Sequence, residues 1–323
     1  MTIRTFLAAV FCSHLLSFAA GNHSFSDARK RFQDILVIVK YNYKAPPGSV
    51  LLHLRMWNKV FLNQIIFVPW TVQEIGNFTE RNLVGNGNVT IVSKIDPEEI
   101  DTGYLAYEVV TSAMKSHPDV AGYLFVHDDL AMNVSALMDL DQKKVWRSDF
   151  IQREICRDLD EGWKNKTNYW WWNSEWGTDA IDQMLLNHTD IAAEMKESLG
   201  SNHIWCGEQS DFFYIPQKYK DSYIRVMSAF AESNIFLEIA VPTFIRAYIP
   251  RSKCSKVLTC TFFTDEGRND FAYMERECGD KYPLYHPVKL SSRLNVVGMK
   301  KKMALIDDST NLRKSFQKRP AQP

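Results

Sequence analysis

Apolar runs alternate with amphipathic stretches in the first part of the chain. The run Ile35–Val39 is short, uninterrupted and rich in β-branched residues, as expected of a strand buried on both faces. Three further runs of this kind follow, at Ile65–Pro69, Val89–Ile95 and Gly122–Val126. Residues 50–61 and 103–116, which lie between these runs, have apolar positions at helical spacing. This alternation predicts an α/β fold with a mixed, mainly parallel sheet flanked by helices.

The second part of the chain is less regular. We expect helices at 178–199 and 218–233, and a loop that leads into a strand over 205–216. Residues 236–245 form an apolar segment, and the polar stretch 265–280 predicts a loop. The folded part closes near residue 298. The tail 299–323 is rich in lysine and arginine and poor in apolar residues, which predicts disorder.

The N-terminus has the pattern of a secretory signal. Arg4 precedes a mostly apolar run, Phe6–Ala20, which ends among small residues, so we expect 1–21 to be a signal peptide. A signal anchor, which would give membrane attachment through the N-terminus, is the alternative, although the run is short for a membrane span. A buried N-terminal helix fits less well because the run is apolar on all sides.

Glycosylation signals and cysteines favour the same compartment. Cys12 lies in the predicted signal, and an oxidising lumen would pair some of the other cysteines, with one left over: Cys156, Cys206, Cys254, Cys260 and Cys278. Asn-x-Ser/Thr acceptor motifs begin at Asn22, Asn77, Asn88, Asn133, Asn165 and Asn187. We therefore expect a protein of the Golgi or endoplasmic reticulum lumen, or a secreted one.

Composition permits a large soluble core and gives no overall charge. The chain has 323 residues, 46% of them hydrophobic, and its 38 lysines and arginines balance 38 aspartates and glutamates. A nucleic-acid partner usually requires a basic face, so we expect none. A phosphate-bearing ligand would need a local site.

An acid pair follows the fourth predicted strand directly. His127, Asp128 and Asp129 come immediately after Gly122–Val126. Ligands of parallel sheets bind outside the carboxyl ends of the strands, which is where these acids would lie. Carboxylates suit hard divalent cations, which in turn stabilise a departing diphosphate. The competing interpretation is that the acids only cap a helix or lie in a solvated turn.

The order of elements and two short motifs resemble GT-A glycosyltransferases. The strand at Val37–Val39 leads, after two strand–helix units, to Tyr123-Leu-Phe-Val-His-Asp-Asp129, which is similar to the Asp-x-Asp metal motif and its Glu-Asp-Asp and Asp-Asp-Asp variants. The closing Tyr285-His286-Pro-Val-Lys289 is similar to the end of that fold. STELLO-type plant glycosyltransferases look nearest, and the exostosin-like C-terminal domain is more distant. The resemblance covers about 33–295, with His127 where the family has an acid.

The resemblance implies a division of roles among these residues. It makes 33–135 the nucleotide-binding half and 136–298 the acceptor half of a GT-A-like domain spanning 33–298. It implies Mn²⁺ or Mg²⁺ held by Asp129 and His286, with Asp128 in the metal shell or on the ribose. His127 binds the metal, contacts the ribose, or only packs. Lys289 would meet the diphosphate and Tyr41 the base; a surface lysine, a packed tyrosine and a histidine in a simple turn are the plainer alternatives.

An inverting transfer needs a carboxylate that accepts the acceptor hydroxyl's proton. Asp211 and Glu208 are candidates, and Asp211 is preferred because it precedes the apolar run 212–215. Glu238 is a third candidate, because a carboxylate in an apolar run must be paired, exposed or functional. A salt bridge would explain Glu238 equally well.

The expected activity is transfer of a sugar from a nucleotide-diphospho-sugar, UDP-sugar first, to a glycan or glycoprotein. A tryptophan-rich loop could form a sugar-stacking platform, or equally a lid over the core: Trp170, Trp171, Trp172 and Trp176. The main alternative is a catalytically degenerate luminal protein that binds sugars or acts as a scaffold. A two-metal hydrolase fits least, because dense histidine–acid clusters are missing from the sequence.

Overall fold

The computed structural model describes much of the predicted domain. The described residues are 25–41, 50, 57, 60–70, 88–93, 104–149, 155–159, 171, 174–279, 282–292, 295 and 299. Several predictions fall outside them: the signal segment 1–21, the tail beyond Met299, most of the helix 50–61, the acceptors Asn22, Asn77 and Asn165, and the tryptophans Trp170 and Trp172.

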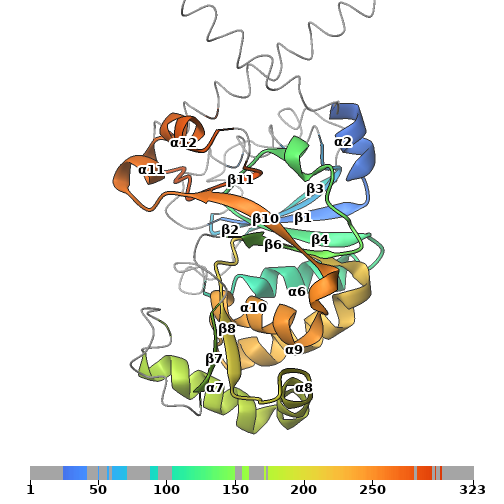
Figure 1. Ribbon diagram of the computed structural model, residues 1–323. Helices are drawn as coiled ribbons and strands as arrows, with labels where there is room; N and C mark the ends of the chain where they lie inside the picture. Colours follow the sequence, from blue (N-terminus) through green and yellow to red (C-terminus); the bar gives the residue numbers. More distant parts are fainter. Residues whose placement is uncertain are drawn as a thin grey trace, which may run out of the picture.

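Nine strands of the described residues form one sheet in the order β3-β2-β1-β4-β9-β6-β10-β11-β5 (Figure 1). Their bounds are β1 Ile35–Lys40, β2 Asn63–Val68, β3 Asn88–Ser93, β4 Gly122–His127, β5 Ala131–Met132, β6 Val145–Asp149, β9 Phe212–Pro216, β10 Cys254–Thr261 and β11 Leu284–His286. Strands β9 and β5 are antiparallel to their neighbours, and the remaining pairs are parallel. The predicted α/β class with a mixed, mainly parallel sheet is confirmed.

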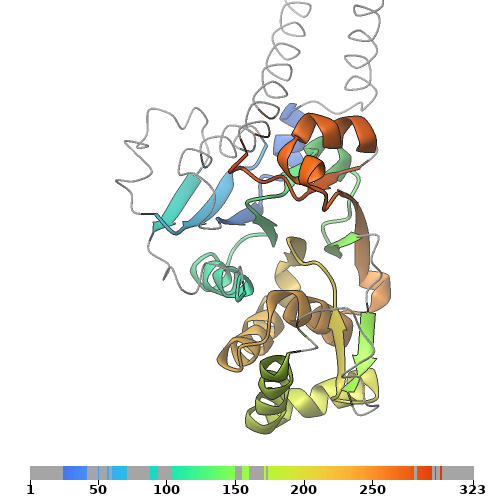
Figure 2. The same ribbon diagram turned by 90° about the vertical axis from the view of Figure 1, so that its left-hand side faces the viewer.

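Helices cover both faces of the sheet. The helices α6 Tyr107–Ser116, α9 Lys220–Glu232 and α10 Leu237–Tyr248 pack on the lower face in Figure 1. On the other side lie α2 Phe25–Arg31, α11 Asp265–Asn269 and α12 Phe271–Cys278 (Figures 1 and 2). Alternate residues of β1 belong to the two hydrophobic cores: Leu36 and Ile38 to one, Val37 and Val39 to the other. Burial of both faces explains the apolar run that predicted this strand.

The predicted helix 178–199 is two helices. It divides into α7 Glu175–Asn187 and α8 Thr189–Leu199, because His188 leaves the helical conformation with φ −124° and ψ 62°. Asp190 in the first turn of α8 is a start signal in the sequence. The helix predicted at 218–233 is present as α9.

Two stretches predicted as loops are regular structure. The first part of 205–216 is β8 Ile204–Gly207, which pairs with β7 Ile155–Asp158 in a separate two-stranded sheet. The polar stretch 265–280 contains α11 and α12. Their helix caps are Thr264 and Asp270, whose side chains accept backbone N–H bonds at each helix start. The apolar segment 236–245 lies in α10, with Pro242 inside the helix.

Two disulfides hold the chain. Cys156–Cys206 joins β7 to β8, and Cys260–Cys278 joins β10 to α12. Cys254 belongs to neither, which agrees with the odd cysteine count. No helix among the described residues has both the length and the apolarity needed to cross a bilayer.

Candidate metal and active site

Three strand ends meet at one edge of the sheet. Strands β4 and β11 run in the same direction, so His127 and His286 close them at the same edge. Strand β9 runs the other way, and Val126 opposite Phe212 therefore places Asp211 beside the end of β4. The backbone N–H of His127 donates to the Asp211 carbonyl at 2.9 Å. The fold thus brings together residues that are distant in sequence.

The acid pair lies in a turn that leaves β4. The N–H of Leu130 donates to the His127 carbonyl at 3.2 Å, which places Asp128 and Asp129 at the centre of the turn. The turn leads into β5, which pairs with β11 through Ala131 and Tyr285. The Asp129 carbonyl in turn accepts the N–H of Val288. This pairing explains how the end of β11 reaches the acid pair.

Asp129 is the centre of the cluster. Its Oδ1 lies 3.5 Å from His286 Nε2 and 3.2 Å from His127 Nδ1. His286 Nε2 also lies 3.4 Å from Asp211 Oδ2, and His127 Nδ1 lies 3.1 Å from Asp128 Oδ1. Lys289 donates from Nζ to Asp129 Oδ2. His127, Asp128, Asp129 and His286 are buried, Asp211 is half-buried, and the Lys289 side chain is 40% exposed.

The charges in the cluster shift one another's pKa values. Burial alone would lower the pKa of both imidazoles, but Asp128 and Asp129 raise the pKa of His127 well above 6.5. Asp211 and Asp129 likewise raise the pKa of His286 above 6.5. Burial alone would raise the pKa of Asp129, yet His286 and His127 hold it well below 3.8. Positive charge on the histidines and on Lys289 therefore balances the carboxylates.

The donor set fits a divalent cation. Asp129, Asp211 and His286 each offer one ligand atom, and these atoms lie within 4.8 Å of one another, as do those of His127, Asp128 and Asp129. Carboxylate oxygens suit magnesium and manganese, and an imidazole nitrogen favours the manganese side of that pair. A bound cation would take over the role of the positive groups that now surround the carboxylates, which are the two histidines and Lys289.

The other two candidate acids lie outside the cluster. Glu208 is on the loop between β8 and β9, which also carries Asp211, and Glu238 is on α10. Glu208 is buried and forms an ion pair with Arg147 of β6, so its charge is already compensated. Glu238 stands in the first turn of α10, where a carboxylate is favourable, and is half-buried. The Glu238 carbonyl accepts the N–H of Glu208 at 2.9 Å. A helix start therefore accounts for the acid in the apolar run.

For Tyr41 and Trp171 the structure supports the alternative in which the ring packs in the core. Tyr41 is completely buried and its ring packs against Trp70 with the centroids 5.7 Å apart, so the ring has no exposed face in this structure for a base. Trp171 is also completely buried, and its indole N–H donates to the Tyr104 hydroxyl at 2.6 Å. Trp171 thus covers the core and is no sugar platform. Trp176 lies in α7, and its side chain is outside the described residues.

Sequence reasoning missed two basic residues near the site. Lys40 closes β1 opposite His127, is only 3% exposed, and its carbonyl accepts the N–H of Asp128 at 3.1 Å. A lysine that ends a fully apolar strand is a signal that could have been used, because buried lysines are rare. Arg147, the partner of Glu208, could not be found, because its pairing depends on the register of β6 with β9.

Comparison with known proteins finds distant relatives. No protein-family model matches the chain. It is 20% identical over 205 residues to "Probable glycosyltransferase STELLO1" and 19% identical over 199 residues to "Probable glycosyltransferase STELLO2", both of Arabidopsis thaliana. Each match covers 61% of this chain, which spans only 25% of those relatives' length. The predicted resemblance to STELLO-type glycosyltransferases is confirmed, and the exostosin-like one stays a prediction.

A solved structure is also similar in outline. It is described as "Crystal structure of a glycosyltransferase involved in the glycosylation of the major capsid of PBCV-1". It is 10% identical, with a TM-score of 0.39, and the alignment covers 83% of this chain and 99% of that one.

Proposed function

We propose that this protein is a glycosyltransferase that uses a divalent cation to bind a nucleotide-diphospho-sugar and transfers the sugar to a glycan or glycoprotein. The observation that carries the proposal is the meeting of Asp129, Asp211 and His286 at the carboxyl edge of the sheet. Similarity to the two STELLO proteins supports the reaction class. UDP is the nucleotide to test first.

Asp129 and His286 are the proposed protein ligands of the cation, with Asp128 completing the shell. A bound cation would stabilise the negative charge that develops on the departing diphosphate. His127 contacts both Asp128 and Asp129 through Nδ1, and we assign it the role of orienting the two acids. Residues that hydrogen-bond to metal ligands fix the orientation of those ligands and also tune the metal site.

Lys289 is the proposed contact for the diphosphate. Its ammonium group pairs with Asp129 and is the exposed member of the cluster. A divalent cation on Asp129 would compete for that carboxylate and release the lysine toward a phosphate oxygen on the solvent side. Pairing with Asp129 and the nearby acids also raises the pKa of Lys289, although burial opposes this, so the group stays charged.

Asp211 is the proposed base. Of the three candidate acids it alone lies in the cluster, 3.4 Å from His286, whereas Glu208 is neutralised by Arg147. Accepting a proton from the acceptor hydroxyl requires a carboxylate within hydrogen-bond reach of that hydroxyl. Glu238, at the start of α10, remains the second choice.

The lumen of the secretory pathway is the proposed location, with the Golgi first. Two disulfides and exposed acceptor motifs at Asn88 and Asn187 support it. The half-buried Asn133 is the acceptor nearest the site. Membrane attachment through the N-terminus belongs to the same proposal.

The test is thermal unfolding of the protein with UDP and candidate UDP-sugars, each with and without Mn²⁺. Binding to the folded state alone stabilises it by about 2.7 kcal/mol at a ligand concentration of 100 times Kd. We expect stabilisation by UDP only when the cation is present. Equal stabilisation in EDTA would contradict a cation-dependent donor site.

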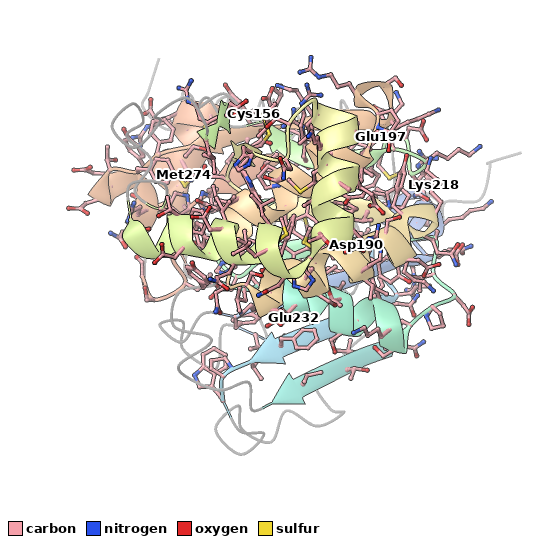
Figure 3. The ribbon with its side chains drawn as sticks, turned by 90° about the horizontal axis from the view of Figure 1, so that it is seen from below. Cys156, Asp190, Glu197, Lys218, Glu232 and Met274 are labelled. Carbon is pink, nitrogen blue, oxygen red and sulfur yellow. A yellow bond between two sulfur atoms is a disulfide. The ribbon has the colours of Figure 1, made fainter. Side chains whose placement is uncertain are left out.

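The variant Asp211→Asn separates the base from the ligands. If Asp211 is the base, the variant keeps cation-dependent UDP binding and loses sugar transfer. Asp190→Asn is the matched control, because Asp190 is an exposed acid on α8 at the far face of the molecule (Figure 3). Loss of UDP binding in Asp211→Asn would make Asp211 a metal ligand instead.

A further inference from the structure

Phe263 is an exposed aromatic residue beside the cluster of acids and histidines around Asp129. It is 45% exposed, one of the large hydrophobic side chains on the surface of the described residues, with Leu186 and Leu258. It lies two residues after the end of β10, at the sheet edge where His286 ends β11. Its ring lies edge-on to the His286 ring, with the centroids 6.1 Å apart and the planes at 79°. An exposed phenyl ring is therefore held next to a proposed cation ligand.

Arg268 stacks on the same ring. Its guanidinium carbon lies 5.5 Å from the centroid of the Phe263 ring, within cation–π range. Among the residues that the structure describes, no carboxylate forms an ion pair with Arg268, and its buried Nε has no hydrogen-bond partner. A half-buried guanidinium without a counter-ion has unused capacity for an anion.

The backbone fixes this pair relative to the cluster. A Cβ on Gly267 would come within 2.3 Å of Phe262 Cβ, so the turn after β10 is packed too tightly for a larger residue. The Arg268 carbonyl accepts the N–H of Lys289 at 3.1 Å. The Phe262 N–H donates to the His286 carbonyl at 3.2 Å. Phe263 and Arg268 are thus tied to the segment that carries His286 and Lys289.

We infer that Phe263 and Arg268 form the acceptor subsite and that the acceptor is an acidic sugar. The Phe263 ring contacts both His286, a proposed cation ligand, and the Arg268 guanidinium. A pyranose packed on the exposed part of Phe263 would lie beside the proposed cation ligand His286, and a carboxylate on that sugar could meet Arg268. Aromatic rings bind the apolar faces of sugars, and arginine pairs with carboxylates in a fork geometry. This inference rests on the proposed function.

The test compares two probes that differ at one group: methyl glucuronide, which has a carboxylate at C6, and methyl glucoside, which has a hydroxymethyl group there. Their affinities are measured by ligand-observed NMR titration, with and without UDP and Mn²⁺. Wild-type protein should bind the glucuronide more tightly. Arg268→Gln should weaken glucuronide binding about tenfold or more, the loss usual for a bond to a charged group, and bring it to the level of the glucoside.

Phe263→Ala should weaken the binding of both probes. Phe263→Tyr should bind both as the wild type does, because it keeps the ring. Leu186→Ala is the control, since Leu186 is equally an exposed hydrophobic residue but lies on α7, away from β11 (Figure 1). Thermal unfolding of every variant checks that it is folded.

Three outcomes overturn the inference: equal affinity of the wild type for both probes, glucuronide binding unchanged in Phe263→Ala, or an effect of Arg268→Gln on UDP–Mn²⁺ binding alone. The last would assign Arg268 to the donor diphosphate. Absence of any cation-dependent UDP binding would instead contradict the proposed function, and the probes without nucleotide would still test this pair.

Discussion

At the site, burial and neighbouring charges act in opposite directions on single residues. Asp129 must remain charged in a buried position, and it does so because His127, His286 and Lys289 surround it. Burial of a carboxylate without such partners would cost several kcal/mol. The same partners are what a cation would displace. The sequence indicated Asp129 and His286 through short motifs, but their 3.5 Å separation depends on the pairing of β5 with β11.

The metal-free protein should lose stability as the pH rises above 6.5. His127 and His286 have pKa values raised above 6.5 in the folded state, so they stabilise the fold fully below that pH. This contribution disappears as the pH rises through their folded-state pKa values. Asp129 acts in the opposite sense, and its contribution is lost only as the pH falls below 3.8.

Thermal unfolding in EDTA between pH 5 and pH 8 measures this trend. The double variant His127→Gln/His286→Gln should show a flatter profile over the same range. A wild-type profile that rises steadily toward pH 8 without metal would show that the two histidines are not protonated in the folded protein.

At the scale of the elements, the strands are packed so tightly that one added methyl group would clash with a neighbouring side chain. Gly122 begins β4, at the end away from the site. A Cβ there would lie 2.2 Å from the Tyr214 hydroxyl oxygen. The Tyr214 ring stacks on Trp146 with centroids 4.2 Å apart, and its hydroxyl donates to the Gln142 carbonyl at 3.2 Å, so the ring cannot easily retreat.

Gly122→Ala should therefore destabilise the fold by about 1–3 kcal/mol, the usual cost of overpacking. In a Tyr214→Leu background the penalty should shrink to about 0.5 kcal/mol or less, because the clashing ring is gone. Urea denaturation of the four proteins in this double-mutant cycle gives the coupling. An equal penalty in both backgrounds would place the strain elsewhere.

Strands buried on both faces were the elements most accessible from sequence. The apolar runs of β1, β2 and β4 need no knowledge of distant contacts. Strand β8 was missed because its partner β7 lies 50 residues earlier at the disulfide Cys156–Cys206. Helix α12 was missed because its charged residues hide the buried positions Phe271, Met274 and Cys278, although these have helical spacing.

At the scale of the whole molecule, both predicted halves contribute to one sheet. Strand β9 of the acceptor half pairs with β4 of the nucleotide-binding half, and β5 pairs with β11. The division at residue 135 is thus one of proposed roles within a single sheet. The site lies where the halves meet, which explains why no local stretch of sequence could reveal all of it.

The disulfide Cys260–Cys278 braces the side of the molecule that carries α11 and α12. It closes a loop with a sequence separation of 18 residues, for which chain entropy predicts about 3 kcal/mol of stabilisation. Cys278→Ser should lower the unfolding free energy by that amount, as measured by urea denaturation. Cys254→Ser is the control and should change it little, since Cys254 belongs to neither disulfide. An equal loss in both variants would contradict the pairing.

The most direct test of the account is the binding of Mn²⁺ itself, followed by the electron paramagnetic resonance signal of the free ion during titration. We expect one tight site in the wild type and in Asp190→Asn, which removes an exposed acid far from the cluster. Asp129→Asn and His286→Gln should each weaken binding at least as much as loss of an outer-shell partner, about 10- to 100-fold. If Asp129→Asn binds Mn²⁺ as tightly as the wild type, the ion does not lie at the end of β4 and the catalytic proposal is wrong.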